Sequence, residues 1–159
     1  MAADAEATIA TVLAKSLAET HEAAIRLLSR REYSGAEMRR KLVSKGLQAA
    51  VVDRVVDQLV SDALLSDGRF ADALVHSRIG RGQGPIKIRA ELRERGVSEE
   101  LIEDTLTQTA EFWLERAEQA RCKRFGADLP EDRGQWTKEA RFLAQRGFPA
   151  DLIYRVLGN

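Results

Sequence analysis

The sequence predicts an all-α protein built from three tandem three-helix repeats, which we expect to stack into an elongated, curved helical solenoid. Apolar residues recur at helical spacing along the chain, whereas no stretch of convincing length alternates apolar and polar residues as a β-strand does. A pattern of leucine, glycine and apolar residues returns three times with a period near 50 residues, which indicates an internal repeat. Units of about 50 residues bury little core alone, so we expect the repeats to share one.

A glycine marks the centre of each repeat. A leucine lies four residues before it and an apolar residue directly after it. This spacing is typical of a helix that ends in a Schellman motif, where glycine adopts the left-handed conformation and the next residue packs back on the helix. The three glycines, each with the two residues expected to pack across its turn, are Gly46 with Leu42 and Leu47, Gly96 with Leu92 and Val97, and Gly147 with Leu143 and Phe148.

Each repeat is expected to hold one longer helix, one short and mostly basic helix, and one acidic or apolar helix. The longer helices are predicted over residues 20–32, 67–80 and 110–125. In the first repeat the capping-box sequence from Ser34 to Glu37 predicts a short helix that begins near residue 35 and ends at Lys45.

The third helix of each repeat is expected directly after the glycine. In the first repeat it carries an apolar stripe, and in the second it begins at the N-cap Ser98. Pro149 is expected in the first turn of the last helix. The stripe of the first repeat consists of Val51, Val52, Val55, Val56, Leu59 and Val60.

These elements predict four parts of the chain. Residues 1–22 form an acidic helical tail, residues 23–66 the first repeat, residues 67–109 the second and residues 110–159 the third.

The charge balance hides a pattern along the chain. The 25 basic and 25 acidic residues cancel, yet residues 23–46 carry a net charge of +5 and residues 97–119 a net charge of −6. A neutral protein can still present a positive face to a polyanion if its basic helices share one side. The few aromatic residues, 6% of the chain, do not favour base stacking.

We therefore predict that basic residues of the repeats bind a partner or DNA, through phosphate groups and without sequence preference. The predicted contacts are Arg39, Arg40, Lys41, Arg78, Arg81, Lys87, Arg89 and Arg93. The third repeat adds a further basic group, made of Arg121, Lys123, Arg124, Lys138, Arg141 and Arg146.

No arrangement of residues favours catalysis, and we expect no cofactor and no metal. The chain holds two histidines and a single cysteine, Cys122, which we expect to be a packing residue, and it lacks the common hydrolase and zinc motifs. The stretch from Gly80 to Pro85 has the wrong spacing for a dinucleotide fingerprint. We interpret it as a flexible joint between helices, with a contact from Arg81 to a backbone phosphate as the alternative.

The cellular setting is expected to be the cytoplasm. A single cysteine argues against a disulfide scaffold, and the longest stretch without charge is too short to span a bilayer. The first residues are acidic where a secretory signal is basic.

The repeat residues resemble a known family. The run Ser34-x-x-Glu37-Met38-x-x-Lys41-Leu42-x-x-x-Gly46 resembles the first repeat of the RecX regulators of bacterial RecA recombinase. The second repeat is similar to that family through Asp67-Gly68-Arg69-Phe70-Ala71, Ser77-Arg78, Gly82, Gly84-Pro85, Ile88-Arg89, Glu91-Leu92 and Gly96. The third repeat departs from the pattern, because Glu139 occupies the position of Met38 and Ile88.

The resemblance implies a regulator without enzymatic activity. It implies that the protein binds RecA and its nucleoprotein filament and suppresses ATP hydrolysis, strand exchange and promotion of repressor cleavage. We expect a monomer that also contacts single- and double-stranded DNA. The alternative is a helical protein that binds DNA without sequence preference and has no recombinase target.

Overall fold

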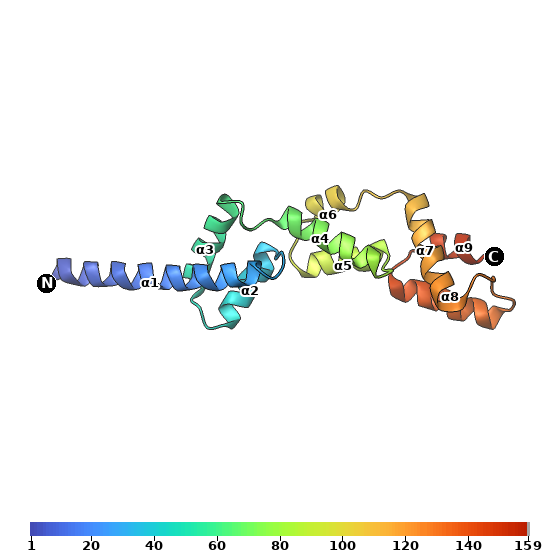
Figure 1. Ribbon diagram of the computed structural model, residues 1–159, viewed down its shortest axis with the longest axis horizontal. Helices are drawn as coiled ribbons and strands as arrows, with labels where there is room; N and C mark the ends of the chain where they lie inside the picture. Colours follow the sequence, from blue (N-terminus) through green and yellow to red (C-terminus); the bar gives the residue numbers. More distant parts are fainter. Residues whose placement is uncertain (159) are drawn as a thin grey trace. The chain divides into compact units, whose positions relative to one another are not determined.

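The computed structural model describes residues 1–158, and every regular element in them is a helix (Figure 1). The nine helices in this part of the chain confirm the all-α prediction. They are α1 (Ala2–Leu28), α2 (Gly35–Ser44), α3 (Ala49–Ser61), α4 (Asp67–Gly80), α5 (Pro85–Glu94), α6 (Glu99–Thr105), α7 (Ala110–Phe125), α8 (Arg133–Arg146) and α9 (Ala150–Leu157). The chain divides into two compact units, one of residues 1–70 and one that begins at Ala71.

The first unit packs α1, α2 and α3 around one apolar core. Helix α3 supplies more of it than any other helix, and its Val52, Val56 and Leu59 are fully buried. Met38 and Leu42 of α2 pack into the same core, and the repeat pattern predicts this for Leu42. The predicted stripe is wrong only at its last member: Val60 is 53% exposed. Nine residues after Val51, a helix has turned that position to the opposite face.

Helix α1 is longer than predicted. The sequence suggested a tail followed by a helix over residues 20–32, but one continuous helix runs from Ala2 and ends at Leu28. Its side chains are exposed from the start through Lys15, and burial begins where α2 and α3 pack against its second half. Figure 1 shows the first turns of α1 extending past α2 and α3.

The start of α4 is tied to α2 by a side-chain cap. Asp67 Oδ1 accepts a hydrogen bond from the backbone N–H of Gly35 at 2.7 Å. Arg69 donates to Glu32 and to the carbonyl of Ala63 at 3.0 and 2.9 Å. These contacts give Asp67 and Arg69 of the Asp67-Gly68-Arg69 segment a structural role.

All three predicted Schellman motifs are present. Gly46, Gly96 and Gly147 have φ of +89°, +81° and +94°. The residue after each glycine donates its backbone N–H to the leucine four residues before that glycine, at 3.4, 3.0 and 3.2 Å. The three leucines are fully buried, so each helix end is also a core contact.

In the second unit the end of α8 docks against the start of α5. The N–H groups of Gly84 and Ile86 donate to the carbonyls of Arg146 and Gly147 at 2.7 and 3.0 Å. The free N–H groups at one helix start are thus capped by the free carbonyls at another helix end. Helix α4 itself stops in a hydrogen-bonded turn at Gly82, whose φ is +77°. Hydrogen bonds thus hold the predicted joint at both ends.

Glu139, which stands where the other repeats have an apolar residue, forms a buried ion pair in the third repeat. Its Oε2 lies 3.2 Å from Nη1 of Arg121, and the two side chains are only 8% and 4% exposed. Arg121 also donates to the carbonyls of Ala127 and Asp128. Arg121 is thus a structural residue, because its charge is compensated inside the fold.

We predict that Gly147→Ala destabilises the protein more than Gly46→Ala. Both glycines are left-handed, a conformation that costs alanine about 1–2 kcal/mol. A Cβ on Gly46 would meet nothing within 4 Å, whereas one on Gly147 would lie 2.5 Å from Cβ and 2.6 Å from the backbone N of Lys87. We expect a further loss of at least about 1 kcal/mol for Gly147→Ala.

Urea unfolding followed by circular dichroism measures this difference in the free energy of unfolding. Equal losses for the two variants would contradict the close approach of α8 to α5.

Candidate functional site

The basic side chains of the repeats fall into two groups, those that hold an ion pair within the fold and those that do not. Arg39 on α2 belongs to the first group. Its guanidinium lies 3.2 Å from Oδ1 of Asp53 and 2.9 Å from Oδ1 of Asp57, both on α3. The pair connects the second and third helices of the first repeat.

The second repeat has the same connection. Arg89 of α5 is paired with Glu103 of α6, and Arg93 with Glu99. Arg89 and Glu103 each lie 50 positions after Arg39 and Asp53, so the contact repeats with the sequence period. We call these contacts the interhelix clamps. The hydrogen bond from Arg93 lowers the pKa of the Glu99 carboxyl.

Arg78 joins α4 to α5 through a bidentate pair. Its Nε and Nη2 donate to the two carboxylate oxygens of Glu91 at 2.7 and 2.6 Å. The side chains are 18% and 20% exposed, which makes this pair better shielded than the clamps. The hydrogen bond from Arg78 holds the pKa of Glu91 below its ordinary value.

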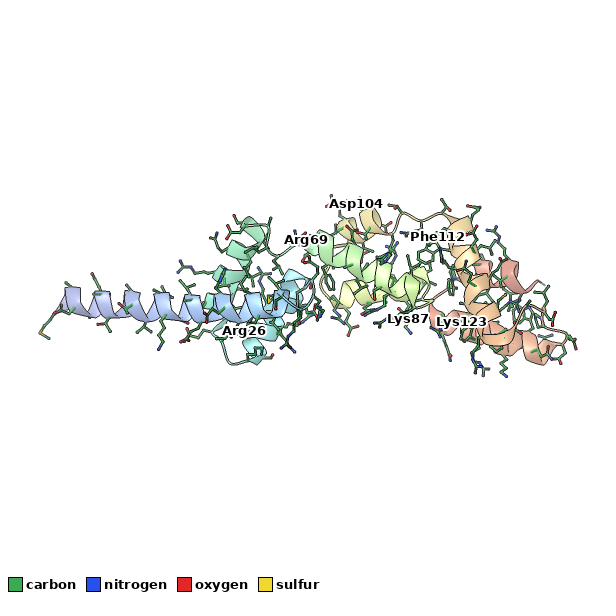
Figure 2. All side chains as sticks on the ribbon, viewed as in Figure 1. Arg26, Arg69, Lys87, Asp104, Phe112 and Lys123 are labelled. Carbon is green, nitrogen blue, oxygen red and sulfur yellow. The ribbon has the colours of Figure 1, made fainter. Side chains whose placement is uncertain are left out.

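The other predicted contacts are exposed to solvent. Arg40 and Lys41 lie on α2, Arg81 follows α4, and Lys87 projects from α5 (Figure 2). Arg39, Arg78, Arg89 and Arg93 are held in pairs that connect helices, a role that sequence reasoning missed. The 14-residue spacing shared by Arg39–Asp53 and Arg89–Glu103 was the available signal.

The third repeat lacks the clamp. Ala140 and Tyr154 stand where the first two repeats place the arginine and its carboxylate. The one acidic residue of α8, Glu139, is buried against Arg121. The remaining cations of α8 therefore have no carboxylate on α9 to neutralise them at this position.

A shallow hollow of about 800 Å³ lies over α7 and α8 in the third repeat. Four cations and no carboxylate line it, and Phe125 and Phe142 meet there edge to face with ring centroids 5.2 Å apart. We call this hollow the basic trough. Its cations are Arg124, Arg133, Lys138 and Arg141.

Three of the trough cations belong to the basic group predicted for the third repeat, and Arg133 was missed. Phe125 is only partly buried. Cations without carboxylates around an open hollow produce a positive potential that favours a polyanion. The trough therefore offers several cationic contacts to phosphate groups, which do not depend on base sequence.

Other classes of site have weaker support. Within residues 1–158 no group of three or more histidine, cysteine or carboxylate side chains could hold a metal ion. Cys122 is exposed on α7, so its predicted packing role is wrong. No helix in the same residues is long and apolar enough to cross a membrane.

Models of the RecX three-helix domains match the chain in order. The first domain matches residues 21–59, the second residues 66–106 and the third residues 110–157.

Curated relatives agree with these matches. The regulatory protein RecX of Halorhodospira halophila is 43% identical over 132 residues, which cover 83% of this chain and 82% of the relative. That of Chromohalobacter salexigens is 41% identical over 137 residues, covering 86% and 89%.

Two solved structures share the fold. A crystal structure of regulatory protein RecX has a TM-score of 0.80 at 27% identity and covers 96% of this chain and 76% of that one. The crystal structure of RecX from Lactobacillus salivarius has a TM-score of 0.76 at 22% identity, covering 90% and 95%.

We predict that Glu91→Gln lowers the free energy of unfolding by about 1–2 kcal/mol at pH 7, because it removes a bidentate charge-assisted contact with Arg78. The folded-state pKa of Glu91 lies below the ordinary 4.5. Its contribution is therefore complete above that value and is lost as the pH falls through the folded pKa. The difference between variant and wild type should shrink below about pH 4.

Urea unfolding at pH 7 and pH 3 measures both effects. Glu100→Gln on α6 is the matched control, because Glu100 is exposed. A difference for Glu91→Gln that does not change with pH would argue against the ion pair as its source.

Proposed function

We propose a function from one premise: this chain belongs to the RecX family of regulatory proteins. We infer that it is a negative regulator of the RecA recombinase and is not itself an enzyme. It binds RecA and the RecA–DNA filament and suppresses ATP hydrolysis, strand exchange and promotion of repressor cleavage. We further propose that it acts as a monomer in the cytoplasm.

The observation that carries the proposal is the basic trough in a chain of three RecX domains. A nucleoprotein filament presents DNA phosphates along its length, and a hollow whose charged lining residues are all cations complements them. The contact requires no base sequence, which suits a partner that coats DNA of any sequence.

The interhelix clamps support the same function in another way. Arg39 and Arg89 use their charge to join helices, so the corresponding surfaces of the first two repeats are closer to neutral. We propose that these repeats contribute contacts to the protein of the filament, while the trough contacts the DNA. The exposed residues of these repeats remain proposed contacts. They are Arg40 and Lys41 in the first repeat and Arg81 and Lys87 in the second.

The second candidate function is DNA binding without sequence preference and without a recombinase target. The basic trough favours it equally, because the trough by itself selects for phosphate and not for RecA. The two functions differ in one measurable respect. A filament regulator binds the RecA filament more tightly than bare DNA, whereas a simple DNA-binding protein does not.

We predict that the protein suppresses ATP hydrolysis by its cognate RecA on single-stranded DNA at fewer than one molecule per RecA subunit. The physical reason is that one bound regulator affects many subunits of a polymer. The measurement is the steady-state hydrolysis rate while the protein is titrated. Full hydrolysis with the protein in excess over RecA and DNA sites would reject the filament function.

The trough is tested in the same assay by the triple variant Arg133→Gln, Lys138→Gln and Arg141→Gln. Each phosphate contact to a single strand contributes about 0.7 to the salt slope of binding, so losing three at 0.1 M salt predicts about a hundredfold weaker binding to bare single strands. We expect half-maximal suppression of hydrolysis to need at least about tenfold more of this variant.

The matched control removes three exposed charges outside the trough with Arg30→Gln, Lys45→Gln and Arg54→Gln. It should behave like wild type, and both variants should retain their helical circular dichroism. Equal weakening by the two variants would show that net charge matters and the trough does not.

A further inference from the structure

A second hollow, of about 450 Å³, lies at the α4–α5 joint, where residues from Ile79 to Gly82 line it together with α7 and α8. We call it the joint pocket. Five cations and no carboxylate line it, and none of the five holds an ion pair in residues 1–158. These cations are Arg81, Arg116, Lys123, Arg124 and Arg146. Lys123 projects from α7 (Figure 2).

Two of the arginines are held in place by neutral partners. Arg146 donates from Nη1 to the carbonyl of Arg81 at 3.0 Å, and its guanidinium carbon lies 5.2 Å from the ring centroid of Phe142. Arg116 donates to Gln119 at 3.1 Å and lies over the ring of Phe112. Both guanidinium groups are oriented while their charge remains uncompensated, which prepares them for an anion.

Arg116 also carries an unsatisfied donor. Its Nε is buried and has no hydrogen-bond partner among the described residues. An unpaired buried donor costs about 1–3 kcal/mol in a folded protein, so such groups are uncommon and call for an explanation. Because this Nε is shielded from solvent, an anion in the pocket satisfies it only if Arg116 shifts toward the pocket that its side chain lines.

The joint pocket adjoins the basic trough. Arg124 and Phe142 line both hollows. The cationic lining therefore extends over eight residues, far beyond what one small anion neutralises. A polynucleotide strand places successive phosphates along such a path, and the partly buried rings of Phe125 and Phe142 lie beside it.

We propose that the joint pocket binds a phosphodiester group of a single-stranded polynucleotide and that this contact locks the α4–α5 joint onto α7 and α8. The anion is held from α7 by Arg116 and Lys123, with Arg81 of the joint and Arg146 of α8 completing the site. The same joint already donates the N–H groups of Gly84 and Ile86 to the end of α8. The proposal rests on the polynucleotide binding of the proposed function and adds its site and its structural consequence.

The test is amide hydrogen exchange at Gly84 and Ile86, measured by NMR on the full chain without RecA. Opening the joint exposes these two amides, and a ligand that binds only the closed joint slows their exchange. With an oligothymidylate of about 20 nucleotides at a hundred times its Kd, we expect up to about a hundredfold slowing. Unchanged exchange at saturation would overturn the proposal.

Two variants with equal loss of charge separate the pocket from the trough. The pocket variant is Arg116→Gln with Lys123→Gln, and the trough variant is Arg133→Gln with Lys138→Gln. Losing two phosphate contacts at 0.2 M salt weakens binding about tenfold in either case. At saturating oligonucleotide the trough variant should still slow the two amides, whereas the pocket variant should not. Equal slowing in both variants would overturn the proposal.

Inorganic pyrophosphate distinguishes a strand from a small anion. We expect the oligonucleotide to slow the two amides at a concentration of phosphate groups at least tenfold lower than pyrophosphate requires. Equal potency would reject a polynucleotide as the occupant. None of these measurements contains RecA, so a failure here is separate from a failure of the hydrolysis assay.

Discussion

A left-handed glycine ends the second helix of every repeat, and the arrangement of each repeat depends on it. At Gly46, Gly96 and Gly147 the chain reverses within two residues, so the third helix begins at once and packs beside the second. The leucine that receives the turning hydrogen bond is fully buried in each case. One residue without a side chain therefore sets both the helix length and the position of the next helix against the core.

The third of these glycines has an additional constraint. Gly147 lies so close to Lys87 that a side chain would overlap the start of α5, and its carbonyl caps the N–H of Ile86. The same turn thus closes the third repeat and connects it to the second. The joint pocket is built beside this connection, which explains how binding an anion there would affect the hydrogen bonds that hold it.

The repeats use equivalent positions for different purposes. Arg39 and Arg89 neutralise themselves against the third helix of their own repeat, and the third repeat replaces this contact with Ala140 and Tyr154. Burial of Glu139 against Arg121 removes the last carboxylate of α8 from the surface. As a result, the cations of the basic trough in the third repeat face no carboxylate, whereas Arg39 and Arg89 of the other two repeats are paired in the clamps. The net charge of zero reveals none of this.

The sequence by itself determined the helical class, the three glycine turns and the bounds of α4 and α7, because these follow from local rules: helical periodicity, glycine conformation and end-capping residues. It also predicted that basic residues matter, but not which of them are available. Whether an arginine is paired depends on whether packing brings a carboxylate close to it. Packing brings Asp53 to Arg39 and Glu91 to Arg78. The docked joint at Gly84 and the basic trough likewise depend on contacts between distant segments. Only the tertiary structure decided them, since charge and propensity are properties of residues whereas neutralisation and enclosure are properties of their neighbours.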